Sequence, residues 1–144
     1  VRGAETVDML QAMNTGHDGS LTTVHANSPR DTISRLETLV LMAGMELPAQ
    51  AIRDQISSAI HLIVQQARFS DGTRKVTHVS EVTGLEGDMV TLQHIYEFKR
   101  TGIDEDGRVL GYHTATGNIP TFVHRLREEG VEVDLSMFEP TEPE

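Results

Sequence analysis

The residues best suited to chemistry lie in one short stretch, 16–28, which combines glycines, two histidines, four hydroxyl residues and an asparagine. Its β-branched part predicts a strand over 19–25, which would place His25 and Asn27 at the carboxyl end of that strand. In open α/β sheets, ligands bind at this edge. The two imidazoles, the asparagine amide and the hydroxyls of Ser20, Thr22 and Thr23 together suit hydrogen bonding to phosphate oxygens or to an attacking water.

A helix is predicted to follow this strand directly. Ser28 can cap it, Pro29 suits its first turn, and Asp31 occupies the position of a capping-box acid. The free N–H groups of a helix N-terminus attract anions, so the same stretch favours a phosphate site. The alternative is that the hydroxyl residues only form the strand and that His25 is a hydrogen-bonded strand-end residue, and composition alone favours it. Arg35, one turn into the helix, could likewise form an exposed ion pair with Asp31.

Other kinds of site find little support in the sequence. His17 and His25 would stand more than about 15 Å apart across a strand, and no further ligand cluster completes a metal site, so no metal is expected. The chain has neither a Gly-Lys-[Ser/Thr] phosphate loop nor a G-x-S-x-G nucleophile elbow. The remaining histidines occur singly and are expected to be structural or exposed: His61, His78, His94, His113 and His124.

The elements that must position these residues follow from the hydrophobic periodicity. Helices are predicted over 4–15, from Ser28 to Gly44, and from Pro48 to about residue 60. The pattern then changes to that of strands, at 61–64, 74–85, 89–99 and 108–114, with glycine-containing turns between them and a closing helix from Pro120 to Gly130. The predicted class is α/β, in which helices and one early strand precede an antiparallel meander.

Composition limits the possible function classes. The 144 residues contain no cysteine, which excludes disulfides, cysteine-ligated metals and thiol catalysis. The formal net charge of −10 argues against broad binding to nucleic acid, and no apolar run reaches the roughly 20 residues needed to span a bilayer. We therefore expect a soluble intracellular protein, whose membrane role, if any, goes through partners. Residues 131–144 are predicted to form an acidic, disordered tail.

Six stretches, spread over roughly residues 1–130, carry a family resemblance by both identity and order. They are Val-Arg-Gly-Ala-Glu at 1–5, Asp-Met-Leu-Gln-Ala-Met-Asn-Thr-Gly-His-Asp-Gly-Ser at 8–20, Thr-Thr-Val-His-Ala-Asn-Ser at 22–28, Ser-Arg-Leu-Glu at 34–37, Asp-Gln-Ile at 54–56 and Val-Thr-His-Val-Ser-Glu-Val at 76–82. Together they closely resemble the CpaF-type (tight-adherence) branch of the type II/type IV secretion ATPases.

The resemblance implies a fold and a set of site residues. Residues 1–130 would be the C-terminal part of a RecA-like P-loop NTPase domain, with central strands flanked by helices, incomplete without its N-terminal half. Residues 16–28 would be the family's histidine box, in which His25 senses the γ-phosphate and His17 supports the loop. Arg2 and Glu5 would belong to the network next to the Walker B segment. Thr23, Asn27 and Arg35 would contact the nucleotide.

The resemblance also implies partners and a location for the full-length parent. That protein would use ATP and Mg²⁺, assemble as a homo-hexamer, and dock on inner-membrane platform proteins at the cytoplasmic face. It would couple ATP hydrolysis to protein export or pilus assembly, without binding nucleic acid and without inserting into the membrane itself.

The family motifs missing from this sequence lead to a further expectation. The chain starts at Val1 without an initiator Met, as if cut from a longer protein, and carries no Walker A loop. Phosphoryl transfer depends on positioned phosphates and Mg²⁺, so the chain alone is expected to be inactive. The alternative is a non-catalytic interaction or regulatory module with the same fold. A histidine-dependent hydrolase is less favoured, because neither a nucleophile nor a metal set is present.

Overall fold

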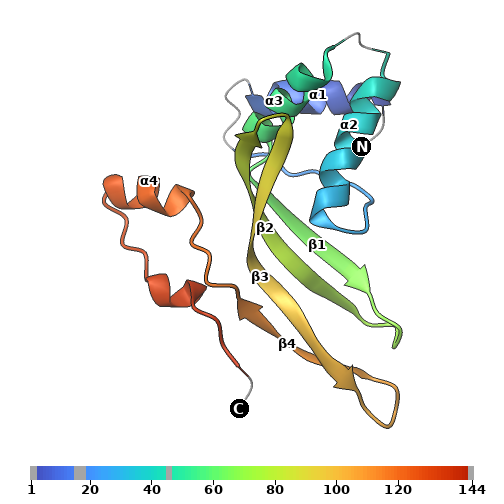
Figure 1. Cartoon of the computed structure of the whole chain (residues 1–144), viewed down its shortest axis with the longest axis vertical. Helices are drawn as coiled ribbons and strands as arrows, with labels where there is room; N and C mark the ends of the chain where they lie inside the picture. The colour runs from blue at the N-terminus through green and yellow to red at the C-terminus, as the bar shows by residue number, and fades with distance from the viewer. Residues whose placement is uncertain (1–2, 15–18, 45–46, 143–144) are drawn as a thin grey trace. The chain divides into compact units, whose positions relative to one another are not determined.

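The computed structural model describes residues 3–14, 19–44 and 47–142. The elements follow in chain order as helices α1 (Gly3–Asn14), α2 (Pro29–Met42) and α3 (Ala49–Ala59), strands β1 (Leu62–Arg68), β2 (Arg74–Glu86), β3 (Met89–Ile103) and β4 (Val109–Ala115), helix α4 (Phe122–Glu128) and the 3₁₀ helix η1 (Leu135–Phe138) (Figure 1). The chain divides into two compact units. Residues 1–62 and 82–92 form the helical unit, and residues 63–81 and 93–144 form the sheet unit.

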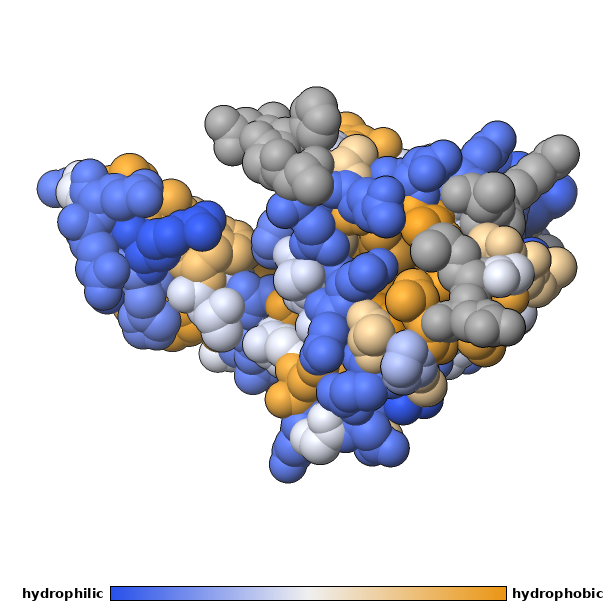
Figure 2. Space-filling model, turned by 90° about the horizontal axis from the view of Figure 1, so that it is seen from above, coloured by the Kyte–Doolittle hydropathy of each residue, from blue (hydrophilic) through white to orange (hydrophobic). Residues whose placement is uncertain are grey.

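In the helical unit, α1, α2 and α3 contact one another pairwise (Figure 1). Their shared core contains Leu10, Leu36, Ile52 and Ile56, all of them almost completely inaccessible to solvent. Buried apolar residues recur at helical spacing in α2, where Ile33 and Val40 flank Leu36, and in α3, so burial of one apolar stripe per helix explains the packing. Some apolar side chains remain exposed, and Figure 2 shows apolar surface on this unit as seen from above.

The strands form one four-stranded sheet in the order β1-β2-β3-β4, which is the predicted meander. β3 and β4 are antiparallel, with Phe98 opposite His113, and a register shift interrupts the pairing between Arg100 and Gly102. In the sheet unit, the main apolar cluster joins Ile95 of β3 to Val123 of α4. Consecutive strands therefore pair with their neighbours through short turns, as the turn residues indicated.

The strand predicted over 19–25 is not formed. Residues 19–26 have no regular secondary structure, and Leu21 is fully exposed. A strand is stable only when another strand takes up its backbone hydrogen bonds, and β-branched composition alone does not supply that partner. In the part of the chain that the structure describes, all four strands belong to the meander, so the expected RecA-like central strands are not confirmed.

The segment predicted to be a disordered tail contains ordered structure. Phe138, at the end of η1, is 7% exposed and packs in the cluster of Ile95 and Val123. Asp134 caps η1 by accepting a hydrogen bond from the Ser136 amide at 2.9 Å, and the Tyr96 hydroxyl donates to the Met137 carbonyl at 2.9 Å. The tail was predicted to be disordered because it is rich in acidic residues. Some of its apolar residues nevertheless pack in the sheet unit.

Candidate functional site

The candidate site begins at the first turn of α2, where the predicted cap is confirmed. Ser28 has an extended backbone, and its Oγ accepts a hydrogen bond from the Asp31 amide at 3.0 Å. The Ser28 carbonyl accepts from both the amide and the hydroxyl of Thr32, each at 3.0 Å. Pro29 is buried in the first turn, where a missing N–H costs nothing. The entry into α2 is therefore well defined.

Two arginines join the helices to the end of the β2–β3 hairpin. Arg30 Nη1 of α2 donates to the Val90 carbonyl of β3 at 2.5 Å. Arg53 of α3 donates to Glu37 Oε1 of α2 at 3.2 Å and lies 4.0 Å from Asp88 at the hairpin turn. The Arg30 contact holds the first turn of α2 on β3, and the Arg53 contacts join α3 to the middle of α2 and to the hairpin turn. The sequence contained no signal for the Arg30 contact, because its partner is a backbone carbonyl sixty positions away.

The sequence-predicted site residues lie in three places. Thr23, His25 and Asn27 are exposed in the irregular segment that precedes α2. Glu5 is exposed in the first turn of α1, and Arg35 is exposed on α2. The other two predicted residues, Arg2 and His17, lie outside the described residues.

Chain proximity brings His25 and Asn27 to the N-terminus of α2, but the structure does not bring every candidate together. Within the described ranges, no ion pair joins Arg35 to Asp31 or Glu5 to an arginine. The segment offers an imidazole, an amide and hydroxyls to solvent beside a capped helix start. Groups of these types can hydrogen-bond to the oxygens of an anion.

The sheet unit contains a polar cluster that the sequence analysis missed. Ser80 Oγ lies 2.6 Å from His94 Nδ1, and the rings of His78 and His94 are 4.6 Å apart between centroids. Burial, and secondly the neighbouring His94, lower the pKa of His78 below its usual value. These histidines occur on two different strands, so only the pairing of β2 with β3 reveals the cluster. Ser80 is fully buried, so this hydroxyl–imidazole pair is structural rather than an accessible nucleophile.

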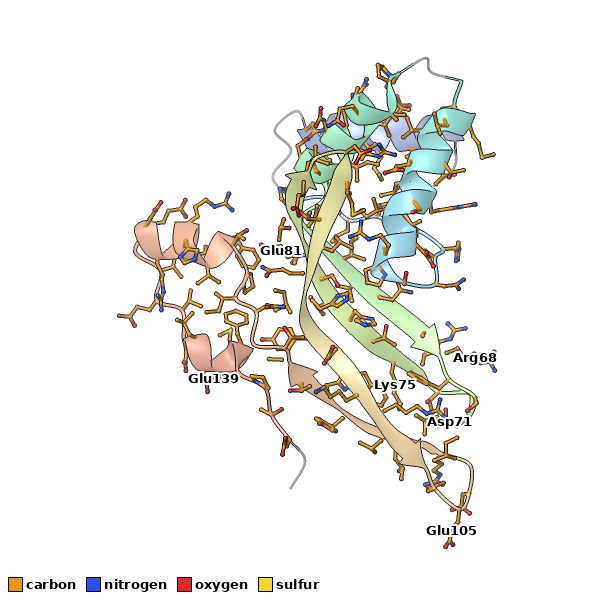
Figure 3. The ribbon with its side chains drawn as sticks, in the orientation of Figure 1. Arg68, Asp71, Lys75, Glu81, Glu105 and Glu139 are labelled. Atoms are coloured by element: carbon orange, nitrogen blue, oxygen red, sulfur yellow. The ribbon has the colours of Figure 1, made fainter. Side chains whose placement is uncertain are left out.

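Glu81 is a second buried polar residue of the sheet unit (Figure 3). Its side chain is 3% exposed and accepts from Gln93 Nε2 at 2.8 Å, from the Thr121 amide at 3.0 Å and from the Thr121 hydroxyl at 2.9 Å. Neutral donors thus satisfy the carboxylate and tie β2 to the residue that precedes α4. In the ranges that the structure describes, no group of three or more histidine, aspartate or glutamate side chains could hold a metal ion.

Comparison with known proteins gives a consistent picture. The model of the family described as "Type II/IV secretion system protein" matches residues 1–105. The chain is 38% identical over 96 residues to the putative conjugal transfer protein MT3759 of Mycobacterium tuberculosis, covering 65% of this chain and 27% of that protein. It is 32% identical over 109 residues to the conjugal transfer protein TrbB of Rhizobium radiobacter, covering 76% and 31%.

A third relative is the type IV secretion system protein VirB11 of Brucella abortus, 36% identical over 85 residues, which is 57% of this chain and 23% of that protein. The chain therefore spans less than a third of the length of these relatives. None of the helices that the structure describes is both long and apolar enough to cross a membrane.

Proposed function

The chain belongs to the type II/IV secretion system protein family, and from that premise we propose that it is the C-terminal part of a secretion ATPase motor. Within the family we favour the CpaF-type branch, which is associated with tight adherence and pilus assembly, on the six stretches quoted above. The relatives are named as conjugal transfer and type IV secretion proteins, which supports transport of macromolecules as the general role.

The proposed nucleotide site is the segment 23–28 together with the first turn of α2. The observation that carries this proposal is the exposure of Thr23, His25 and Asn27 directly before a capped helix N-terminus that Arg30 holds on the β2–β3 hairpin. The amides of a helix N-terminus and its positive dipole end favour phosphate oxygens.

In this proposal each predicted residue has a distinct part. His25 contacts the γ-phosphate and passes its presence on to the Walker B region, to which Arg2 and Glu5 belong. His17 supports the histidine-box loop, while Thr23, Asn27 and Arg35 bind the nucleotide. ATP and Mg²⁺ would bind in the full-length parent.

The assembly and location are part of the same proposal. The parent would form a homo-hexamer at the cytoplasmic face of the inner membrane and act on platform proteins of a secretion or pilus system. This chain alone would not turn over ATP, because it carries no G-x-x-x-x-G-K-[ST] loop to hold the phosphates. The alternative is a non-catalytic interaction or regulatory module that keeps the same fold without nucleotide turnover.

The experiment compares His25→Gln with His124→Gln in the longer protein that carries this chain. His124 is an exposed histidine of α4, far along the chain from the proposed site, so it controls for loss of an imidazole. We expect His25→Gln to lower kcat for Mg²⁺-dependent ATP hydrolysis at least tenfold and His124→Gln to leave it unchanged. Equal activity of the two variants would refute the role of His25. Turnover by the 144-residue chain alone would refute the need for the missing loop.

A further inference from the structure

The β1–β2 hairpin of the sheet unit carries two arginines on either side of its turn. The Phe69 amide donates to the Thr73 carbonyl at 2.8 Å, and Gly72 supplies the positive φ of 86° that the turn needs. Arg68 and Arg74 are the next residues outward on the two strands, so they lie across from each other on one face. Both are exposed. Like charges directly opposite each other destabilise a pair of strands unless an anion lies between them.

The residues that the structure describes place no such anion between these two arginines. Neither Arg68 nor Arg74 forms an ion pair with any residue that the structure describes. The nearest acid in sequence, Asp71, uses its carboxylate to accept from the hydroxyl and amide of Thr73, at 2.6 and 2.9 Å, and from the Val109 amide at 2.8 Å. These bonds, first that of the Thr73 hydroxyl, lower the pKa of Asp71 to about 2.

The same face of the hairpin also exposes apolar side chains. Strand residues alternate between faces, so Val64 shares a face with Arg68 and Val76 shares one with Arg74. Val64 is 63% exposed and Val76 is 39% exposed. We call Val64, Arg68, Arg74 and Val76 the arginine face. Figure 3 labels Arg68 at the end of β1 and Asp71 in the turn that follows it. Two cations next to two exposed valines suit a partner that is both acidic and apolar.

A surface with the opposite charge lies elsewhere on the sheet unit. A hollow of about 580 Å³ follows α4, and the chain from 130 to 134 lines it together with Arg127. Exposed Val131 supplies apolar surface, while Glu132 and Asp134 supply charge. We call this hollow, with the adjoining Glu128 and Glu129, the acidic hollow. The four carboxylates outnumber the two arginines of the last turn of α4, Arg125 and Arg127, and none of the four forms an ion pair among the residues described. Figure 2 shows mostly hydrophilic surface around α4.

We propose that the arginine face of one copy of this chain docks in the acidic hollow of a neighbouring copy. Each surface brings exposed valine, and the two surfaces carry opposite charge. Both surfaces belong to the sheet unit, and no ion pair joins them within one copy among the residues described, so both are available to a second copy. Such a contact uses different patches on the two copies, and repeated contacts of this kind close into rings or extend into filaments.

This contact would be a subunit interface of the proposed homo-hexamer. The closure of such contacts into a ring rests on the proposed function. It needs no nucleotide, so it is measured apart from ATP hydrolysis and can fail independently of it. The experiment uses sedimentation velocity on the full 144-residue chain over a concentration series, in low and in high salt. Association driven by opposite charges weakens as salt rises.

The decisive variants are Arg68→Glu with Arg74→Glu, and Glu129→Arg with Glu132→Arg. We expect each double variant to associate at least tenfold more weakly, and a 1:1 mixture of the two to regain the association, because each altered surface then meets its complement. Arg100→Glu with Arg108→Glu makes the same change in net charge on exposed residues of β3 and the β3–β4 turn, and should associate like the parent.

Circular dichroism reports whether each variant is folded. If charge reversal unfolds the hairpin, Arg68→Gln with Arg74→Gln replaces it and should weaken association in the same direction. A parent chain that stays monomeric at every concentration would overturn the proposal. So would association that the Arg68/Arg74 variant leaves intact, or a mixture that fails to restore it.

Discussion

Replacing Phe138 with alanine tests whether the C-terminal segment is part of the folded sheet unit. Phe138 is 7% exposed and packs against Ile95 and Val123, with Tyr96 beside it at a ring distance of 6.3 Å. Removal of a buried phenylalanine side chain costs about 3–5 kcal/mol, from lost burial and from the cavity left behind. Phe138 lies near the end of the chain, where neighbours can collapse into the space, so we expect about 3 kcal/mol.

The matched control is Met137→Ala, because Met137 is the adjacent residue and is half exposed. Its contact with the Tyr96 hydroxyl is made by the backbone carbonyl and survives the substitution. Urea unfolding followed by circular dichroism should give a loss of about 3 kcal/mol for Phe138→Ala and less than about 1 kcal/mol for Met137→Ala. A loss of about 3 kcal/mol lowers the melting temperature of a chain this size by about 10 °C. Equal stability of the two variants would mean that the segment is not packed, and the original prediction of a disordered tail would stand.

Three further predictions concern the sheet unit. Glu81→Ala should lower the free energy of unfolding in urea by about 3 kcal/mol, because the Thr121 amide and the Gln93 side chain lose their acceptor. Glu81→Gln should lower it less, and equal losses would contradict the hydrogen-bond argument. Burial and His94 lower the pKa of His78, so protonation of this histidine favours the unfolded chain and the free energy of unfolding should fall as the pH drops below the usual histidine pKa near 6.5. His78→Asn should flatten that part of a plot of unfolding free energy against pH, and an unchanged slope would contradict the role of His78. Gly111→Ala should destabilise the fold by about 1–3 kcal/mol, because a Cβ there would meet the Phe98 ring and the Lys99 carbonyl. Gly107→Ala is the comparison variant: its added Cβ meets open space while φ is +81°, so it measures backbone strain without crowding.

Local patterns in the sequence predicted most of the elements. The three helices, the meander and the closing helix follow from periodicity and turn residues, and the cap at Ser28 follows from a four-residue signature. These features depend on neighbours within a few positions. The glycine-containing turns between the predicted strands were enough to indicate that adjacent strands pair.

Features that depend on distant partners were not predictable. The strand over 19–25 failed because strand formation needs a second strand, which composition does not specify. The Ser80–His94 contact joins residues 14 positions apart, and the bonds of Glu81 to Thr121 join residues 40 apart. The arginine pair of the β1–β2 hairpin was likewise not predicted, because only the pairing of β1 with β2 places Arg68 opposite Arg74.

The central claim is that the segment 23–28 and the first turn of α2 bind the γ-phosphate of ATP. Hydrogen exchange of the longer protein that carries this chain tests it most directly, in three states: without nucleotide, with Mg²⁺ and ADP, and with Mg²⁺ and a non-hydrolysable ATP analogue. The account predicts that amides of residues 23–32 exchange more slowly with the ATP analogue than with ADP, and that His25→Gln removes this difference. Equal exchange of these amides in all three states, while the protein binds the analogue, would contradict it.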